Sequence, residues 1–285
     1  MYKIIRKKEL KPTVFLMDIE APMVAKKAEA GQFIILRTDK DGERIPLTVS
    51  GFDREAGTVR IIFRAVGATT DKLGEMKEGD CLADFAGPLG RPTNCSGIQR
   101  ALVVGGGVGC AIALPVAEKL RSLGASVTSV IGFRSSDFVI LEEEFSACSD
   151  KLFLVTDDGS AGERGNACAP ISRLLESGER FDKAIIIGPL VMMKFVVETL
   201  RPYGIPCEVS MNPIMIDGTG MCGGCRLSLI EDGKRVTKFA CVDGPDFDGY
   251  AVDFDEALDR GAMYRDFELR KREEGCNLLR GNDAE

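Results

Sequence analysis

Residues 100–110 read RALVVGGGVGC, an apolar run that ends in a cluster of glycines. An almost uninterrupted apolar run is typical of a strand buried on both faces of a parallel sheet. A helical pattern follows as far as Leu120, so the glycines precede a helix N-terminus, where the backbone can approach a pyrophosphate closely. Cys110 stands where the G-x-G-x-x-G motif has its third glycine, so a plain tight turn is the alternative interpretation. The candidates for dinucleotide contact are Gly105, Gly107, Val108 and Gly109.

Strands and helices continue to alternate beyond this motif. We predict further strands at 126–132, 152–156 and 184–187, and helices at 142–148, 170–176 and 191–200. This alternation predicts a doubly wound parallel sheet, and we assign residues 96–206 to an NAD(P)-binding, Rossmann-like domain. Arg134 follows the second strand, where an arginine can accept the 2′-phosphate of NADP(H).

The chain before residue 87 has a different texture. Short strands separated by turn sequences are predicted at 13–17, 32–36, 45–49 and 58–63. Several short strands at close spacing favour an antiparallel β-barrel. A glycine- and proline-rich stretch at 87–92 is typical of a linker, so we assign residues 1–95 to the barrel.

Composition limits the classes of function. The 285 residues carry 37 Lys and Arg against 44 Asp and Glu, a net charge of −7, which argues against nucleic acid as a partner. The sequence has neither a signal-peptide pattern nor an apolar stretch long enough for a bilayer, so we expect a cytoplasmic protein without membrane partners. Histidine is absent, which removes the usual general base and indicates chemistry carried by a cofactor.

Three of the ten cysteines form a spaced motif. Asp217-x4-Cys222-x2-Cys225, followed by Cys241, matches the C-x4-C-x2-C…C spacing of plant-type [2Fe-2S] ferredoxins with Asp in the first position. Thiolates suit iron, and the surrounding glycines allow a loop to wrap a cluster. A structural zinc site and unliganded thiols are the alternatives. We assign residues 207–285 to a [2Fe-2S]-binding segment with a C-terminal helix over residues 255–270.

The barrel, the glycine-rich domain and the cysteine motif, in that order over nearly the whole chain, resemble the ferredoxin-reductase superfamily. Within it, the chain is similar to the FAD- and NAD-binding electron-transfer subunits of dihydroorotate dehydrogenase and of NADH-dependent reduced ferredoxin:NADP oxidoreductase. Dihydroorotate dehydrogenase subunits carry four cysteine ligands. Asp217 in the first ligand position therefore favours the second kind of subunit.

The resemblance also implies roles for individual residues. An R-P-x-[ST]-like motif and a V-G-x-x-T turn hold FAD in this family; the matching positions are Arg44, which lies one residue earlier than the family's arginine, Pro46, Leu47 and Thr48, and then Val66, Gly67, Thr69 and Thr70. Residues 87–90 match its G-P-L-G junction. The nicotinamide nucleotide cleft is implied for Asp157, Asp158, Gly188, Pro189 and Met192, although a solvated turn and a plain strand exit are the alternatives.

The expected function is electron transfer. Hydride would pass from NAD(P)H to FAD, and single electrons would pass to a [2Fe-2S] cluster and on to a larger flavin or iron–sulfur subunit. We favour NADH, with NADPH as the alternative. The electron-transfer subunit of dihydroorotate dehydrogenase is the second interpretation, and a nucleotide-binding redox sensor or zinc-bound regulatory module is a third of a different class.

Overall fold

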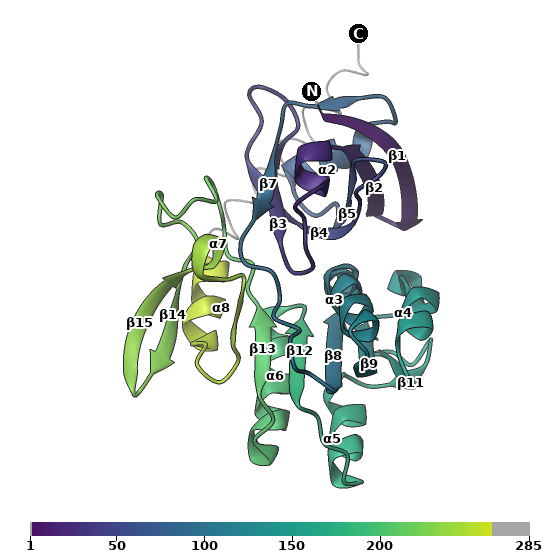
Figure 1. Cartoon of the computed structure of the whole chain (residues 1–285), viewed down its shortest axis with the longest axis vertical. Coiled ribbons are helices and arrows are strands. Elements are labelled where there is room, and N and C mark those ends of the chain that lie inside the picture. The colour runs from purple at the N-terminus through teal and green to yellow at the C-terminus, as the bar shows by residue number, and fades with distance from the viewer. Residues whose placement is uncertain (1, 264–285) are drawn as a thin grey trace, which may run out of the picture.

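The computed structural model describes residues 2–263, and its N-terminal part is a curled antiparallel sheet (Figure 1). Seven strands lie in the order β6-β1-β2-β5-β4-β3-β7. Two short helices, α1 and α2, accompany them. The elements are β1 (Tyr2–Lys11), β2 (Val14–Glu20), α1 (Pro22–Ala25), β3 (Phe33–Arg37), β4 (Ile45–Asp53), β5 (Thr58–Arg64), α2 (Ala68–Glu75), β6 (Cys81–Leu82) and β7 (Asp84–Leu89).

A parallel sheet with helices on both faces follows (Figure 1). Its order is β11-β10-β9-β8-β12-β13-β16, and all pairs are parallel except β13 with β16. The elements are β8 (Arg100–Gly106), η1 (Gly107–Gly109), α3 (Cys110–Ser122), β9 (Ser126–Phe133), η2 (Ser136–Phe138), α4 (Glu142–Cys148), β10 (Lys151–Thr156), β11 (Glu163–Arg164), α5 (Cys168–Glu176), β12 (Lys183–Ile187), α6 (Leu190–Leu200), η3 (Arg201–Tyr203) and β13 (Cys207–Ser210).

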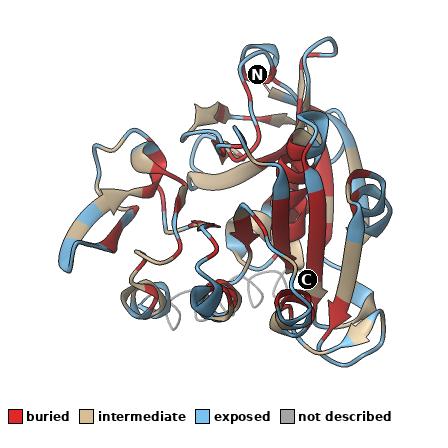
Figure 2. Cartoon of the chain, turned by 60° about the horizontal axis from the view of Figure 1, so that its bottom comes forward, coloured by how far each residue is buried: buried red, intermediate tan, exposed pale blue. Residues whose placement is uncertain are grey.

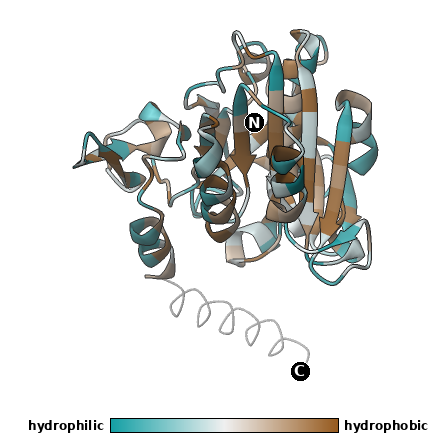
Figure 3. Cartoon of the chain, turned by 90° about the horizontal axis from the view of Figure 1, so that it is seen from below, coloured by the Kyte–Doolittle hydropathy of each residue, from teal (hydrophilic) through white to brown (hydrophobic). Residues whose placement is uncertain are grey.

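The two faces of the central strand β8 belong to two separate apolar cores. Ala101 and Val103 pack with residues of α3 and α4, whereas Leu102 and Val104 pack with residues of α5 and α6. The central strands are buried (Figure 2), and they form the most apolar part of the sheet (Figure 3). This explains the uninterrupted apolar run in the sequence, because a strand covered on both sides has no solvent face.

The cysteine segment is an insertion at the edge of this sheet. β13 ends at Ser210, and Ser210 pairs with Asp246 at the start of the antiparallel strand β16. Between the two strands the chain builds a hairpin and a short helix that project to one side of the molecule (Figure 1). The elements are β14 (Arg226–Glu231), β15 (Lys234–Phe239), α7 (Ala240–Asp243), β16 (Asp246–Asp248) and α8 (Phe254–Ala262).

The two-part fold class predicted from the sequence, a barrel followed by a doubly wound sheet, is confirmed. The sheet, however, continues past residue 206 through β13 and β16. Helix α8 ends at Ala262, and the rest of the helix expected over 255–270 lies outside the described residues. β1 was not predicted, since its sequence YKIIRKKELK is mostly charged and only Ile4 is buried in it. Among residues 2–263, no helix is long and apolar enough to cross a membrane.

Candidate nucleotide-binding and metal-binding sites

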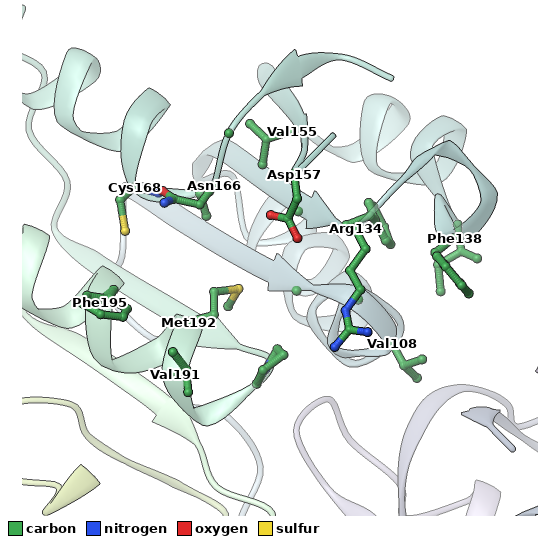
Figure 4. A pocket seen from close by; sticks show the side chains of 18 of the residues that line it. Val108, Arg134, Phe138, Val155, Asp157, Asn166, Cys168, Val191, Met192 and Phe195 are labelled. Carbon is green, nitrogen blue, oxygen red and sulfur yellow. The ribbon is translucent and has the colours of Figure 1, made fainter. Parts of the chain in front are cut away.

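A cavity of about 450 Å³ opens where β8 and β12 end. The chain reaches β9 and β10 on one side of β8 and β12 and β13 on the other, so this is the point where the strand order reverses and ligands of such sheets bind. The predicted residues that line the cavity are Gly107, Val108, Arg134, Asp157, Pro189 and Met192. Figure 4 shows Arg134 and Asp157 entering it from one side and Met192 from the other.

The glycines at this site fall into two structural classes, tightly packed positions and an open one. A Cβ atom at Gly109 would lie 2.6 Å from the carbonyl oxygen of Ile187, and one at Gly105 would lie 2.8 Å from Cys110 Sγ. Gly188 is equally tight against Met192. Gly107 differs, because it has φ +55° and its Cβ direction is open. Gly105, Gly109 and Gly188 therefore hold the strand ends together, and Gly107 faces free space.

The two aspartates of the predicted D-D-G segment separate in the structure. Asp157 lines the cavity. The Asp158 carboxylate instead accepts hydrogen bonds from Ser160 N and Oγ, which lower the pKa of Asp158, and it does not line the cavity. Asp158 therefore holds the turn, and Asp157 remains available to a ligand.

The predicted flavin strand is β4, which runs between β3 and β5. Pro46, Leu47 and Thr48 are half-buried and pair with β3, with Thr48 opposite Phe33. The side chain of Arg44 is committed elsewhere: its Nε donates to the carbonyl oxygen of Ile216 at 2.9 Å, in the cysteine segment. This hydrogen bond, made by the residue before β4, links the barrel directly to the cysteine segment.

The predicted V-G-x-x-T turn forms the N-terminus of α2. Thr70 Oγ1 accepts hydrogen bonds from the backbone N–H groups of Val66 and Gly67, both at 3.0 Å, and it donates to the Gly67 carbonyl oxygen. Thr69 Oγ1 donates to Glu43. A Cβ atom at Gly67 would meet no atom within 4 Å, so the space beside this turn is free for a ligand.

The cysteine segment brings two of its four predicted ligands together. Cys225 and Cys241 are buried with their Sγ atoms 3.2 Å apart, whereas Cys222 is exposed. The Asp217 carboxylate accepts hydrogen bonds from the backbone N–H groups of Thr219 and Cys222, and these bonds lower the pKa of Asp217. Among residues 2–263, no set of three or more ligand side chains converges on one point.

The donor chemistry nevertheless fits sulfur-ligated iron. Burial, followed by the neighbouring Cys225 thiol, raises the pKa of Cys241 to about 12, so the Cys241 thiol keeps its proton until a cation replaces it. The sequence also leaves open that Asp217 only turns the chain and that Cys207 or Cys276 supplies the fourth ligand. Cys207 is buried in β13, where burial raises its pKa to about 12, and Cys276 lies outside the described residues.

Several residues that line the cavity were not identified from the sequence, among them Arg64, Asn166, Cys168 and Phe195. Arg64 ends β5, one residue past the strand predicted there. The other three lie on or beside the helices of the α/β domain, and nothing in their local sequence marks them.

Comparison with known proteins is consistent with this architecture. Residues 212–253 match the iron–sulfur cluster binding domain of dihydroorotate dehydrogenase B. The chain is 45% identical over 266 residues to a dihydroorotate dehydrogenase B electron transfer subunit homolog of Thermotoga maritima, covering 93% of this chain and 92% of that protein. It is 33% identical to the corresponding subunit of Streptococcus pneumoniae, covering 86% of this chain and 97% of that one.

Solved structures agree. A structure of NADH-dependent reduced ferredoxin-NADP oxidoreductase, reported for flavin-based electron bifurcation, contains a chain with 41% identity and a TM-score of 0.90, with 97% of this chain and 98% of that chain covered. The match to phthalate dioxygenase reductase covers 85% of this chain and 95% of the reductase chain, at 15% identity and a TM-score of 0.59. This match shows a shared fold only.

The fold and the cysteine segment together define a ferredoxin-reductase-like oxidoreductase component. The chain belongs to the family of dihydroorotate dehydrogenase B electron-transfer subunits. The predicted resemblance is thereby confirmed. Membership also confirms the predicted cofactors, namely FAD, a [2Fe-2S] cluster and NAD(H), and the prediction of a larger partner subunit.

Proposed function

We propose that this subunit itself takes hydride from NADH and delivers single electrons to a larger partner subunit. The observation that carries the proposal is the position of the cavity, at the strand-order reversal and against the barrel. Val14 and Arg64 of the barrel line it together with Gly107 and Met192 of the α/β domain. A nucleotide bound there contacts both domains, as hydride transfer between two bound cofactors requires.

Residues of this chain position the dinucleotide and the flavin relative to each other. Gly107 and the N-terminus of α3 offer backbone N–H groups to the pyrophosphate, and Met192 and Pro189 close the apolar end of the cavity. Thr48 and the turn at Gly67 would hold FAD on the barrel. When bound, the flavin supplies the conversion of a two-electron donor into one-electron steps, and the cluster supplies one-electron transfer.

The metal site is proposed for Cys222, Cys225, Cys241 and Asp217. Three thiolates and one carboxylate satisfy the four-ligand requirement of a [2Fe-2S] cluster, and no histidine exists to substitute. Arg44 ties this segment to the flavin strand, which favours electron transfer between the two.

The partner would dock near the cluster. Apolar side chains there are unusually exposed, including Met221 at 89% and Ile216 at 54%. We favour the second subunit of an NADH-dependent reduced ferredoxin:NADP oxidoreductase, because Asp217 departs from the four-cysteine pattern. A dihydroorotate dehydrogenase is the second candidate, favoured by the match of residues 212–253. A cytoplasmic location stays a prediction.

Replacing Gly67 with valine tests the flavin assignment. The backbone at Gly67 has φ −154°, which any residue adopts, and its Cβ direction is open, so Gly67→Val folds but occupies the proposed flavin space. We expect loss of bound FAD, measured after denaturation. Gly261→Val, at another open glycine far along the chain in α8, is the control and keeps FAD. Full FAD occupancy in a folded Gly67→Val protein would refute the assignment.

The nucleotide preference has a separate test. Arg134 has no hydrogen bond or ion pair of its guanidinium among residues 2–263 and remains available to a 2′-phosphate, yet Asp157 beside it in the cavity opposes a second negative charge. We expect a higher kcat/KM for NADH than for NADPH in dye reduction. A clear preference for NADPH would overturn this choice.

A further inference from the structure

A second cavity, of about 790 Å³, lies where the barrel faces α3 and α4. Figure 1 shows these two helices next to the barrel. Its walls include Ser50 and Phe52 of β4 and Leu114 and Glu118 of α3, so both domains build it. None of the residues that line it also lines the nucleotide cavity. Its volume is in the range of small-molecule sites, and no step of the proposed electron transfer uses it.

The three basic side chains that line this cavity already have partners. Ion pairs join Arg60 to Asp18 and Lys119 to Glu29. Arg54 donates hydrogen bonds to two backbone carbonyl oxygens of the barrel, and its guanidinium lies over an aromatic ring of β4. This arrangement argues against an anionic ligand, because the basic groups are engaged with the protein itself.

The cavity has an excess of negative charge, since five carboxylates line it against three basic side chains. Asp53 accepts hydrogen bonds from backbone N–H groups of its own turn. Glu118 of α3 and Glu144 of α4, in contrast, form no hydrogen bond or ion pair with any of residues 2–263. Desolvation raises the pKa of Glu118, Arg60 lowers it, and the neighbouring Glu144 carboxylate raises it. The two unpaired carboxylates therefore repel each other, and a bound cation would relieve the repulsion.

A buried hydroxyl in the wall of the same cavity lacks a partner. Ser50 is 7% exposed, and its Oγ atom is buried without a hydrogen-bond partner within the described range 2–263. Val49, the preceding residue, belongs to the barrel core, so the Ser50 side chain leaves the opposite face of β4, which contacts α3. A buried hydroxyl without a partner is unfavourable, and an occupant of the cavity that carries a hydrogen-bond donor would satisfy it.

We propose that this cavity binds an organic dication, an alkyl chain with an ammonium group at each end. The carboxylates of Glu118 and Glu144 bind the ammonium groups, and Ser50 Oγ accepts a hydrogen bond from one of them. Phe52 and Leu114 offer apolar surface to the alkyl chain. A metal ion does not match, because no three ligand side chains converge on one point among residues 2–263 and the cavity is far larger than an ion. The ligand contacts both domains, so its binding stabilises their interface.

Titration calorimetry of the full chain loaded with FAD and cluster tests the proposal. The probe is 1,4-diaminobutane, and the comparison ligands are 1-aminobutane and Mg²⁺. 1-Aminobutane should bind at least about tenfold more weakly, because it carries half the charge. Glu118→Gln and Glu144→Gln should each raise the Kd of diaminobutane about fivefold, and Ser50→Ala should raise it about threefold. Higher salt should weaken binding to the wild type more than to either glutamate variant.

Glu143→Gln is the matched control, because it removes the same charge from α4 outside the cavity. It should leave the Kd unchanged within a factor of about two. FAD content and thermal unfolding are measured for every variant. The proposal is overturned if the wild type shows no saturable binding of diaminobutane, or if Glu118→Gln and Glu144→Gln leave its Kd unchanged. Binding of 1-aminobutane as tight as that of the diamine would also overturn it. Binding of Mg²⁺ that is lost in the two variants, without diamine binding, would assign the cavity to an inorganic cation instead.

Discussion

The nucleotide cavity and the cysteine segment are built on different principles. The cavity is lined by strand ends and helix starts whose positions are set by the sheet, and its tight glycines pack against neighbouring backbone and side chains without any ligand. In the cysteine segment, only Cys225 and Cys241 lie together, and Asp217 is turned onto its own loop. The cavity is therefore determined by packing, whereas the metal site depends on the cation that gathers its ligands.

This difference predicts that the two regions fail separately. The largest contrast comes from the buried thiol pair: Cys225→Ser or Cys241→Ser should reduce iron content to near zero while FAD and NAD⁺ binding persist, because neither thiol lines the cavity. Cys81→Ser, at a half-buried barrel cysteine, is the control and should keep its iron. Iron analysis and NAD⁺ titration measure both properties, and full iron in either variant would contradict the ligand assignment.

Glycine substitutions should have the opposite pattern, with a larger loss of unfolding free energy at the cavity than in the cysteine segment. Gly109→Val forces a side chain against the Ile187 carbonyl oxygen, 2.6 Å from the Cβ position, and should lower the free energy of unfolding by about 3 kcal/mol. Gly223→Ala in the cysteine segment meets Phe239 at an ordinary 3.7 Å and should cost about 1 kcal/mol, since its backbone has φ +67°. Denaturant unfolding compares the two variants. Equal losses would mean that both regions are equally packed.

Asp217 sharpens the comparison further. Asp217→Cys should keep the cluster and lower its midpoint potential by on the order of 100 mV, because thiolate releases more electron density to iron than carboxylate does. Redox titration followed by electron paramagnetic resonance measures the shift. If Asp217→Ala leaves the potential and iron content unchanged while Cys207→Ala or Cys276→Ala removes the iron, Asp217 only caps its loop.

The smallest effect concerns the attachment of the cysteine segment. Asp246 is half-buried, and its Oδ1 atom is buried without a hydrogen-bond partner among residues 2–263. The carboxylate accepts a hydrogen bond from Thr93 Oγ1, just after the interdomain linker, at 2.5 Å, and its pKa is raised mainly by desolvation. Its contribution to stability is fully present below the unfolded pKa of about 3.9 and is lost as pH rises through the raised folded value. Asp246→Asn should make the free energy of unfolding decline less steeply with pH. Denaturant unfolding of both proteins across this pH range measures the difference, and curves with the same slope would contradict the prediction.

Secondary structure could be predicted from the sequence where the hydrophobic pattern of a segment matches the way the segment is buried. α4 was predicted with the bounds that the structure has, and β8 was readable because both its faces are buried. The hairpin of β14 and β15 was missed, although its Asp232-Gly233 turn is a recognisable signal. Arg64 could not be predicted as a cavity residue from the sequence, because its position there depends on the pairing of β2 with β5 and on packing against the second domain.

The edge insertion has a consequence for how such reductases can be rebuilt. Ser210 and Asp246, its two ends, are paired residues of one antiparallel ladder, and the Met211 N–H also bonds the Pro245 carbonyl oxygen. The entry and exit of the cysteine segment are thus neighbours, as in a cassette with adjacent connectors. Replacing residues 212–244 would leave the ladder of β13 and β16 intact, so a different redox module can be grafted at this edge if it also covers the core that Met215, Leu227 and Ala240 now share with α6.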